Sequence, residues 1–115
     1  MSAQAIPLLT LALALTTAAS ASRFVTPAGA QCGADANALG VTRTTGAIAD
    51  KVPVDILGTT IVEAGAAVAA GATLKSDSVG RAITWVTSGA RVGIALDAAT
   101  AAGQFIEVLL IPNAA

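Results

Sequence analysis

The feature that most constrains this chain is the two-residue alternation in its C-terminal stretch, residues 91–111. Large apolar residues occupy every second position on both sides of a small-residue connector, at Val92, Ile94, Leu96, Ile106, Val108 and Leu110. This is the period of β-strands, whose successive side chains point to opposite faces. The stretch therefore predicts two strands paired as a hairpin. We also expect one helical turn over Ala98–Ala102, capped by Asp97 and ended by a left-handed Gly103.

An earlier stretch, residues 39–57, has the same design. Gly40-Val41 corresponds to Gly93-Ile94, and three apolar residues of the second strand also correspond, with one residue inserted in the later connector. A second hairpin is predicted here, which is either a true internal repeat or the alternation that any two hairpins share. Because Pro53 cannot donate a backbone hydrogen bond, we expect an edge strand or a bulge there. We expect a turn at Gly58.

The N-terminal segment allows two interpretations. An apolar run from Ala5 to Leu15, followed by Ala19-Ser20-Ala21, is similar to a secretory signal, in which case residues 1–21 would be removed. However, no Lys or Arg precedes Arg23, and leucine alternates with alanine or threonine over residues 9–16. That alternation predicts a strand with one face of large residues and one of small residues. The run is too short to span a bilayer.

The remaining segments are short and punctuated by glycine. Residues 22–26, 59–63 and 81–86 favour strands, and residues 28–38 favour a surface loop. Gly65 and Gly71 interrupt the alanine-rich stretch 64–73, which favours strand pieces over a helix. The sequence therefore predicts an all-β fold of about eight to ten short antiparallel strands, a small single-domain β-sandwich or open β-barrel. We expect an N-terminal arm at 1–7, the β domain at 8–111 and a tail at 112–115.

Composition limits the possible partners. Six Lys and Arg stand against seven Asp and Glu, for a net charge of −1, and the basic residues are spread singly. No basic stripe exists to hold phosphates, so we expect no direct contact with nucleic acid. About half of the hydrophobic residues are alanine, whose burial contributes little. An isolated copy is therefore expected to be marginally stable and to gain from partner subunits.

Reactive constellations are scarce. The chain has no histidine or tyrosine and one cysteine, Cys32, which excludes the usual zinc sites and Ser-His or Cys-His pairs. Four carboxylates remain as candidates for acid–base catalysis, namely Asp50, Asp55, Asp97 and Glu107. Each lies beside a turn or points outward on a strand, where a solvated carboxylate is common. The stretch 75–78 is typical of a turn rather than of a Ser-Lys dyad. We expect no enzyme, cofactor or metal site, and a bystander loop cysteine.

Trp85 has two interpretations. Tryptophan is enriched at the hot spots of protein interfaces, which makes Trp85 a candidate contact anchor. A buried tryptophan whose indole N–H finds a carbonyl is the structural alternative. The sequence leaves both open.

A series of motifs in fixed order resembles one known family. These motifs are Glu63-Ala64-Gly65-Ala66, Ala69-Ala70-Gly71, the Ser-Asp-x-x-Gly-Arg-Ala stretch at 76–82, and Gly93-Ile94-Ala95-Leu96. Their order and spacing resemble the small capsid cement, or head decoration, proteins of tailed bacteriophages. The first hairpin fits the same pattern, so the resemblance covers roughly residues 38–111 and, more loosely, the opening strand.

The resemblance implies a non-enzymatic protein of the outer virion surface, assembled in the host cytoplasm. Its partner would be the major capsid protein of an expanded head, whose subunit contacts it would stabilise. A homo-oligomer is also implied, a trimer first and a dimer second, with no nucleic-acid or membrane contact. An ordered N-terminal arm often makes contact in such relatives. The residues expected at partner contacts are Ser2, Ala3, Gln4, Ala5, Ile6, Pro7 and Trp85.

The alternative function follows from the signal interpretation of the N-terminus. It is a secreted or periplasmic β-domain that binds a ligand or a surface after residues 1–21 are removed.

Overall fold

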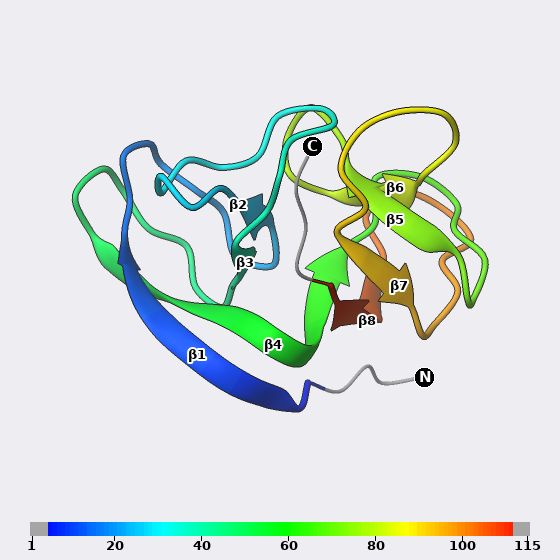
Figure 1. The fold of residues 1–115 in the computed structure, drawn as a ribbon, viewed down its shortest axis with the longest axis horizontal. Coiled ribbons are helices and arrows are strands. Elements are labelled where there is room, and N and C mark those ends of the chain that lie inside the picture. Colours follow the sequence, from blue (N-terminus) through cyan, green and yellow to red (C-terminus); the bar gives the residue numbers. More distant parts are fainter. Residues whose placement is uncertain (1–4, 112–115) are drawn as a thin grey trace.

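The computed structural model describes residues 5–111, which contain eight β-strands and no helix (Figure 1). The strands are β1 (Pro7–Ala14), β2 (Phe24–Val25), β3 (Gly40–Thr42), β4 (Lys51–Glu63), β5 (Thr73–Ser76), β6 (Ala82–Thr84), β7 (Gly93–Ala95) and β8 (Phe105–Leu110). They form a sheet in the order β2-β3-β4-β8-β7-β5-β6, with β1 also paired to β4, and all strand pairs are antiparallel. The predicted all-β class is confirmed.

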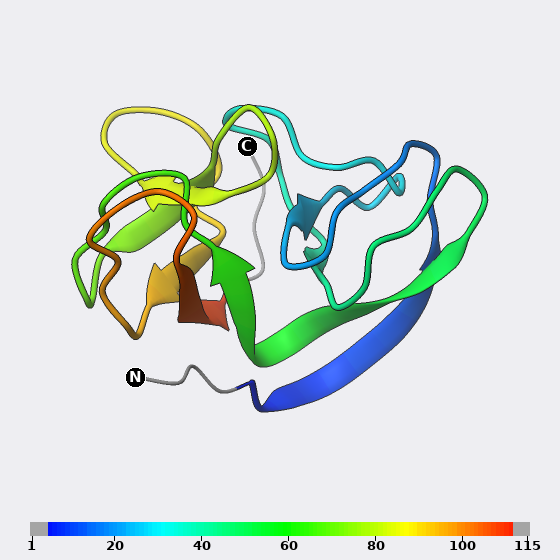
Figure 2. The ribbon, with the colours of Figure 1, turned by 180° about the vertical axis from the view of Figure 1, so that it is seen from behind.

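Strand β4 connects two lobes of the molecule. Its first half pairs with β1 and β3, and its second half pairs with β8. Figures 1 and 2 show β1, β2 and β3 on one side of its bend and β5 to β8 on the other. Gly58 lies at the bend with a φ of 93°. The turn predicted at Gly58 is wrong, because glycine takes this left-handed conformation while its neighbours stay in the strand.

Both predicted hairpins are present. Strand β3 pairs with β4, and β7 pairs with β8. The helical turn predicted over Ala98–Ala102 is wrong. The amide and carbonyl of Ala99 instead form a β-bridge with Val68, and the Asp97 carboxylate accepts the amide of Glu107 at 3.2 Å. Gly103 does have a left-handed φ of 91°, as expected.

The bulge predicted for the strand that contains Pro53 is present in β4, where the register with β1 skips Ile56 between Leu57 and Asp55. Pro53 itself is in regular register with Ala12 of β1, and its carbonyl accepts the amide of Arg43 at 3.0 Å. The β3 ladder ends one residue earlier, at Thr42. Proline is tolerated because the missing N–H falls where the β3 ladder stops.

The two hairpins belong to an internal repeat that spans almost the whole described chain. The antiparallel bridge between Ala19 and Gly46 has its counterpart in the bridge between Val68 and Ala99. Further matched backbone hydrogen bonds, written donor to acceptor, are Leu15 to Asp50 with Ala64 to Gln104, Ser22 to Thr42 with Gly71 to Ala95, Leu39 to Val25 with Val92 to Leu74, and Arg43 to Pro53 with Leu96 to Glu107. We call residues 10–57 repeat 1 and residues 59–111 repeat 2. Two residues are called equivalent when they occupy the same place in the matched backbone hydrogen bonds of the two repeats.

The repeats share the larger of two hydrophobic cores. Its members from repeat 1 are Phe24, Cys32, Ala38 and Val41, and those from repeat 2 include Val62, Leu74, Ile106 and Val108. The smaller core lies within repeat 1 and consists of Leu15, Ala19, Val25, Val52 and Val54. β1 covers residues 7–14 and pairs with β4, which confirms the strand interpretation of the N-terminal alternation. Packing across the shared core fixes one repeat against the other.

Candidate partner-binding surfaces

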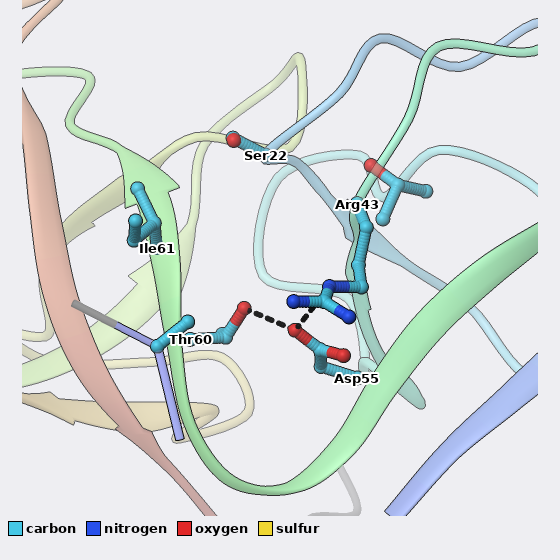
Figure 3. Close-up of a pocket in the computed structure, with 7 residues that line it drawn as sticks. Ser22, Arg43, Asp55, Thr60 and Ile61 are labelled. Atoms are coloured by element: carbon cyan, nitrogen blue, oxygen red, sulfur yellow. Dashed lines mark hydrogen bonds and ion pairs between the residues drawn. The ribbon is translucent and has the colours of Figure 1, made fainter. Parts of the chain in front are cut away.

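A cavity of about 210 Å³ lies at the bend of β4, where the two repeats meet (Figure 3). Asp55 lies at its base and is only 1% exposed. Its carboxylate accepts hydrogen bonds from the hydroxyls of Thr10 at 2.9 Å and Thr60 at 2.8 Å. The Nε of Arg43 lies 3.5 Å from the same carboxylate. The prediction of a solvated Asp55 is wrong, because the bend folds Thr60 over it.

This cluster has the chemistry of a structural joint. Each Asp55 oxygen accepts a hydroxyl, and the guanidinium supplies the compensating charge that a buried carboxylate requires. The Asp55 side chain thus ties β1, through Thr10, and the second half of β4, through Thr60, to the first half of β4. Within residues 5–111, no three His, Cys, Asp or Glu side chains are grouped so as to hold a metal ion. In the same part of the chain, no helix is long and apolar enough to cross a membrane.

Cys32 is buried in the shared core at 1% exposure, not displayed on a surface loop as expected. Burial raises the pKa of its thiol to about 12. The thiol is therefore protonated at neutral pH, and its Sγ donates to the carbonyl of Asn37 at 3.3 Å. Because the thiolate is the reactive form, Cys32 acts as a small core residue.

The predicted arm is described only at its C-terminal end, since Ser2, Ala3 and Gln4 lie outside the described residues. Ile6 exchanges two backbone hydrogen bonds with Thr59, both at 3.1 Å. Its side chain is exposed, and Pro7 is already the first residue of β1. The described part of the arm is thus anchored to β4 while its apolar side chain faces outward.

Trp85 lies in the segment that follows β6. Its indole N–H donates to the carbonyl of Gly89 at 2.9 Å, and the guanidinium of Arg91 lies 4.1 Å from the ring centroid. The Trp85 residue is half-buried. Its N–H has a carbonyl partner, as expected for a core tryptophan, and part of the ring stays accessible, as expected for a contact anchor. In the described part of the chain, no hydrogen bond or cation–π contact joins Trp85 to residues 5–7. The structure therefore gives two separate candidate surfaces.

Sequence reasoning missed a set of exposed leucines. In β1, the large-residue face points toward the repeat 1 core, yet Leu9 and Leu11 remain 41% and 45% exposed. Across the molecule, Leu96 and Leu109 are 44% and 39% exposed on the outer face of the β7–β8 hairpin. Alternation predicted which face each leucine occupies. Whether that face is covered depends on the arrangement of the repeats, which the local pattern does not contain.

The fold and its surfaces define a class: a small all-β structural protein made of two repeats, with apolar side chains at its surface. A family model described as "Phage cement protein" matches residues 3–110, and the chain belongs to this family. The resemblance inferred from the motifs is therefore confirmed. Membership makes the chain a structural protein of the phage capsid, located at the outer surface of the virion.

A solved structure has a similar fold. It is the crystal structure of the head fiber gp8.5 N base in bacteriophage phi29, with a TM-score of 0.71 and 15% sequence identity. The similarity covers 93% of this chain and 97% of that chain. At this level of identity the likeness concerns the fold. No curated protein matches the chain.

Proposed function

We propose that this chain binds the outer surface of the expanded phage head and stabilises contacts between subunits of the major capsid protein. The observation that carries the proposal is the family match over residues 3–110. Exposed apolar side chains in the arm and β1 support it, because they offer contact area without any reactive group. The chain would act as a homo-oligomer, with a trimer as the first expectation. Many copies on one shell would add to its stability through polyvalent attachment.

The arm of residues 1–7 and Trp85 are the proposed contacts with the capsid protein. Ile6 presents an apolar side chain at an anchored backbone, and Trp85 presents a ring face held by Gly89 and Arg91. Preorganised side chains lose less entropy on binding, which favours them as anchors.

The test mixes purified protein with empty expanded heads and measures binding and the temperature at which the heads disrupt. We expect saturable binding and a raised disruption temperature. Deleting Met1–Pro7 should weaken binding, and Trp85→Ala should weaken it by about tenfold or more if Trp85 is a hot spot. Ile48→Ser, at an exposed apolar side chain outside the arm, is the matched control. Undiminished binding after the deletion would reject the role of the arm, and no saturable binding would reject the function.

A further inference from the structure

The two repeats meet in a polar joint at the bend of β4. Repeat 1 supplies Asp55 and Arg43 to this joint, and repeat 2 supplies Thr60, whose hydroxyl lies 2.8 Å from the Asp55 carboxylate. Beside them the amide of Glu63 donates to the carbonyl of Ser22 at 3.1 Å. The contact is thus made by the end of the β3–β4 hairpin of repeat 1 and the first strand of repeat 2.

The contact between the repeats is heterologous, because each repeat contributes a different face to it. Repeat 2 also has a terminal hairpin, β7–β8, and repeat 1 also has a first strand, β1. The outer face of β7–β8 carries Leu96 and Leu109, and this hairpin pairs with no strand of repeat 1 within residues 5–111. In the same part of the chain, β1 is paired only with β4. Heterologous contacts continue from one copy to the next and close into rings when the rotation allows.

The residues at the two unused faces match each other in chemistry. Leu11 is equivalent to Thr60, which is 3% exposed in the joint, whereas Leu11 is 45% exposed. Leu109 and Leu96 are equivalent to Asp55 and Arg43, and they too are accessible leucines. Thr60, Asp55 and Arg43 of the joint are therefore each replaced by leucine on the open faces.

We propose that a second copy of this chain docks head-to-tail on these faces, with Leu11 of one copy against Leu96 and Leu109 of the next. The proposal deepens the proposed function, because it assigns the contact that builds the homo-oligomer. Burial of exposed leucine stabilises such a contact by removing apolar area from water. It also explains why apolar residues occupy accessible positions on both faces.

The first experiment uses sedimentation equilibrium on the full chain up to high micromolar concentration. Wild type should self-associate, and Leu11→Asp or Leu109→Asp should each weaken association by at least about tenfold. Ile48→Asp, at an exposed side chain outside both faces, should leave it unchanged. An equimolar mixture of L11D and L109D should form a heterodimer and stop there, because one intact pair of faces remains. A self-complementary contact would stop wild type at the dimer, whereas the head-to-tail contact lets wild type grow beyond it.

The second experiment rebuilds the polar joint between copies. The triple variant L11T/L96R/L109D places Thr, Arg and Asp at the positions equivalent to Thr60, Arg43 and Asp55, and it should restore association that L109D lacks. Far-ultraviolet circular dichroism and unfolding midpoints check that each variant is folded. Wild type that stays monomeric, L11D that associates like wild type, or mixed variants that stay monomeric would each overturn the proposal.

Binding to heads separates this inference from the proposed function. A monomeric chain that still binds heads rejects the head-to-tail contact alone. A chain that assembles through these leucines but ignores heads rejects the capsid function alone.

Discussion

The two repeats have the same backbone pairing but different side chains, and the comparison shows which features the fold requires. Ala49 and Gly103 are equivalent and both have a positive φ, at 73° and 91°. Ser22 and Gly71 form a second such pair, at 59° and 87°. The repeated features are therefore hydrogen-bond positions and tight backbone conformations. Side-chain identity is preserved at few positions, and one of them lies where strands approach closely.

Gly40 and Gly93 mark such a close approach. A Cβ at Gly40 would overlap the carbonyl oxygen of Asp55, and a Cβ at Gly93 would lie 2.9 Å from the carbonyl oxygen of Leu109. Asp55 and Leu109 are themselves equivalent. The side chains differ instead where the environment differs, with polar groups inside the joint and leucine at the open faces. Whether a face is covered within the chain explains the difference better than strand propensity does.

The largest expected effect tests the shared core. Phe24 is fully buried between the repeats, whereas its equivalent, Thr73, is partly exposed. Phe24→Ala should lower the free energy of unfolding by about 3–5 kcal/mol, because a large buried side chain leaves a cavity. Thr73→Ala should cost less than about 1 kcal/mol. Urea unfolding measures both, and equal losses would contradict the asymmetry.

The next effect tests the shared close approach. Gly40→Ala and Gly93→Ala should each destabilise by about 1–3 kcal/mol through overpacking. Gly40→Ala should be the more severe, because it meets a backbone carbonyl, whereas the nearest atom at Gly93 is the Val108 side chain at 2.6 Å. Gly33→Ala is the control, since a Cβ there meets nothing within 4 Å. Thermal unfolding that ranks Gly33→Ala with the other two would refute this explanation.

A smaller effect tests the equivalent left-handed positions. Ala49→Gly should stabilise by up to about 1 kcal/mol, because glycine relieves the left-handed strain but adds freedom to the unfolded chain. Gly103→Ala should destabilise by about 1 kcal/mol, and no neighbour within 4 Å adds a clash. Chemical denaturation gives both values. Changes of the same sign would show that the two positions are not equivalent.

The smallest effect tests the ion pair between Lys75 of repeat 2 and Asp35 of repeat 1. The hydrogen bond from Lys75, and its charge, hold the pKa of Asp35 below its ordinary value. The ion pair stabilises the fold above the pKa of unfolded aspartate, about 3.9, and this contribution is lost as pH falls through the lower folded pKa. Asp35→Asn should flatten that part of the stability profile. Unchanged acid dependence in Asp35→Asn, measured by urea unfolding across pH, would count against it.

Local pattern predicted much of the fold. Alternation located β1 and both hairpins, and the match between Gly40 and Gly93 indicated the repeat before its full length was visible. The candidate surfaces were predicted less well. Asp55 and Cys32 were expected in solvent but are buried, because each lies where one repeat covers the other. The alternation in β1 indicated a face for Leu11 but not its accessibility.

Sequence by itself determined the short extended segments, their glycine-bounded ends and the absence of histidine chemistry, since these follow from neighbouring residues and composition. The tertiary structure decided that β4 continues through Gly58, that Asp55 is sealed by Thr60, and that Leu11 is left open. The physical reason is that burial depends on which surfaces meet across the bend. Those contacts join residues far apart in the chain, and the two-residue alternation within a strand does not encode them.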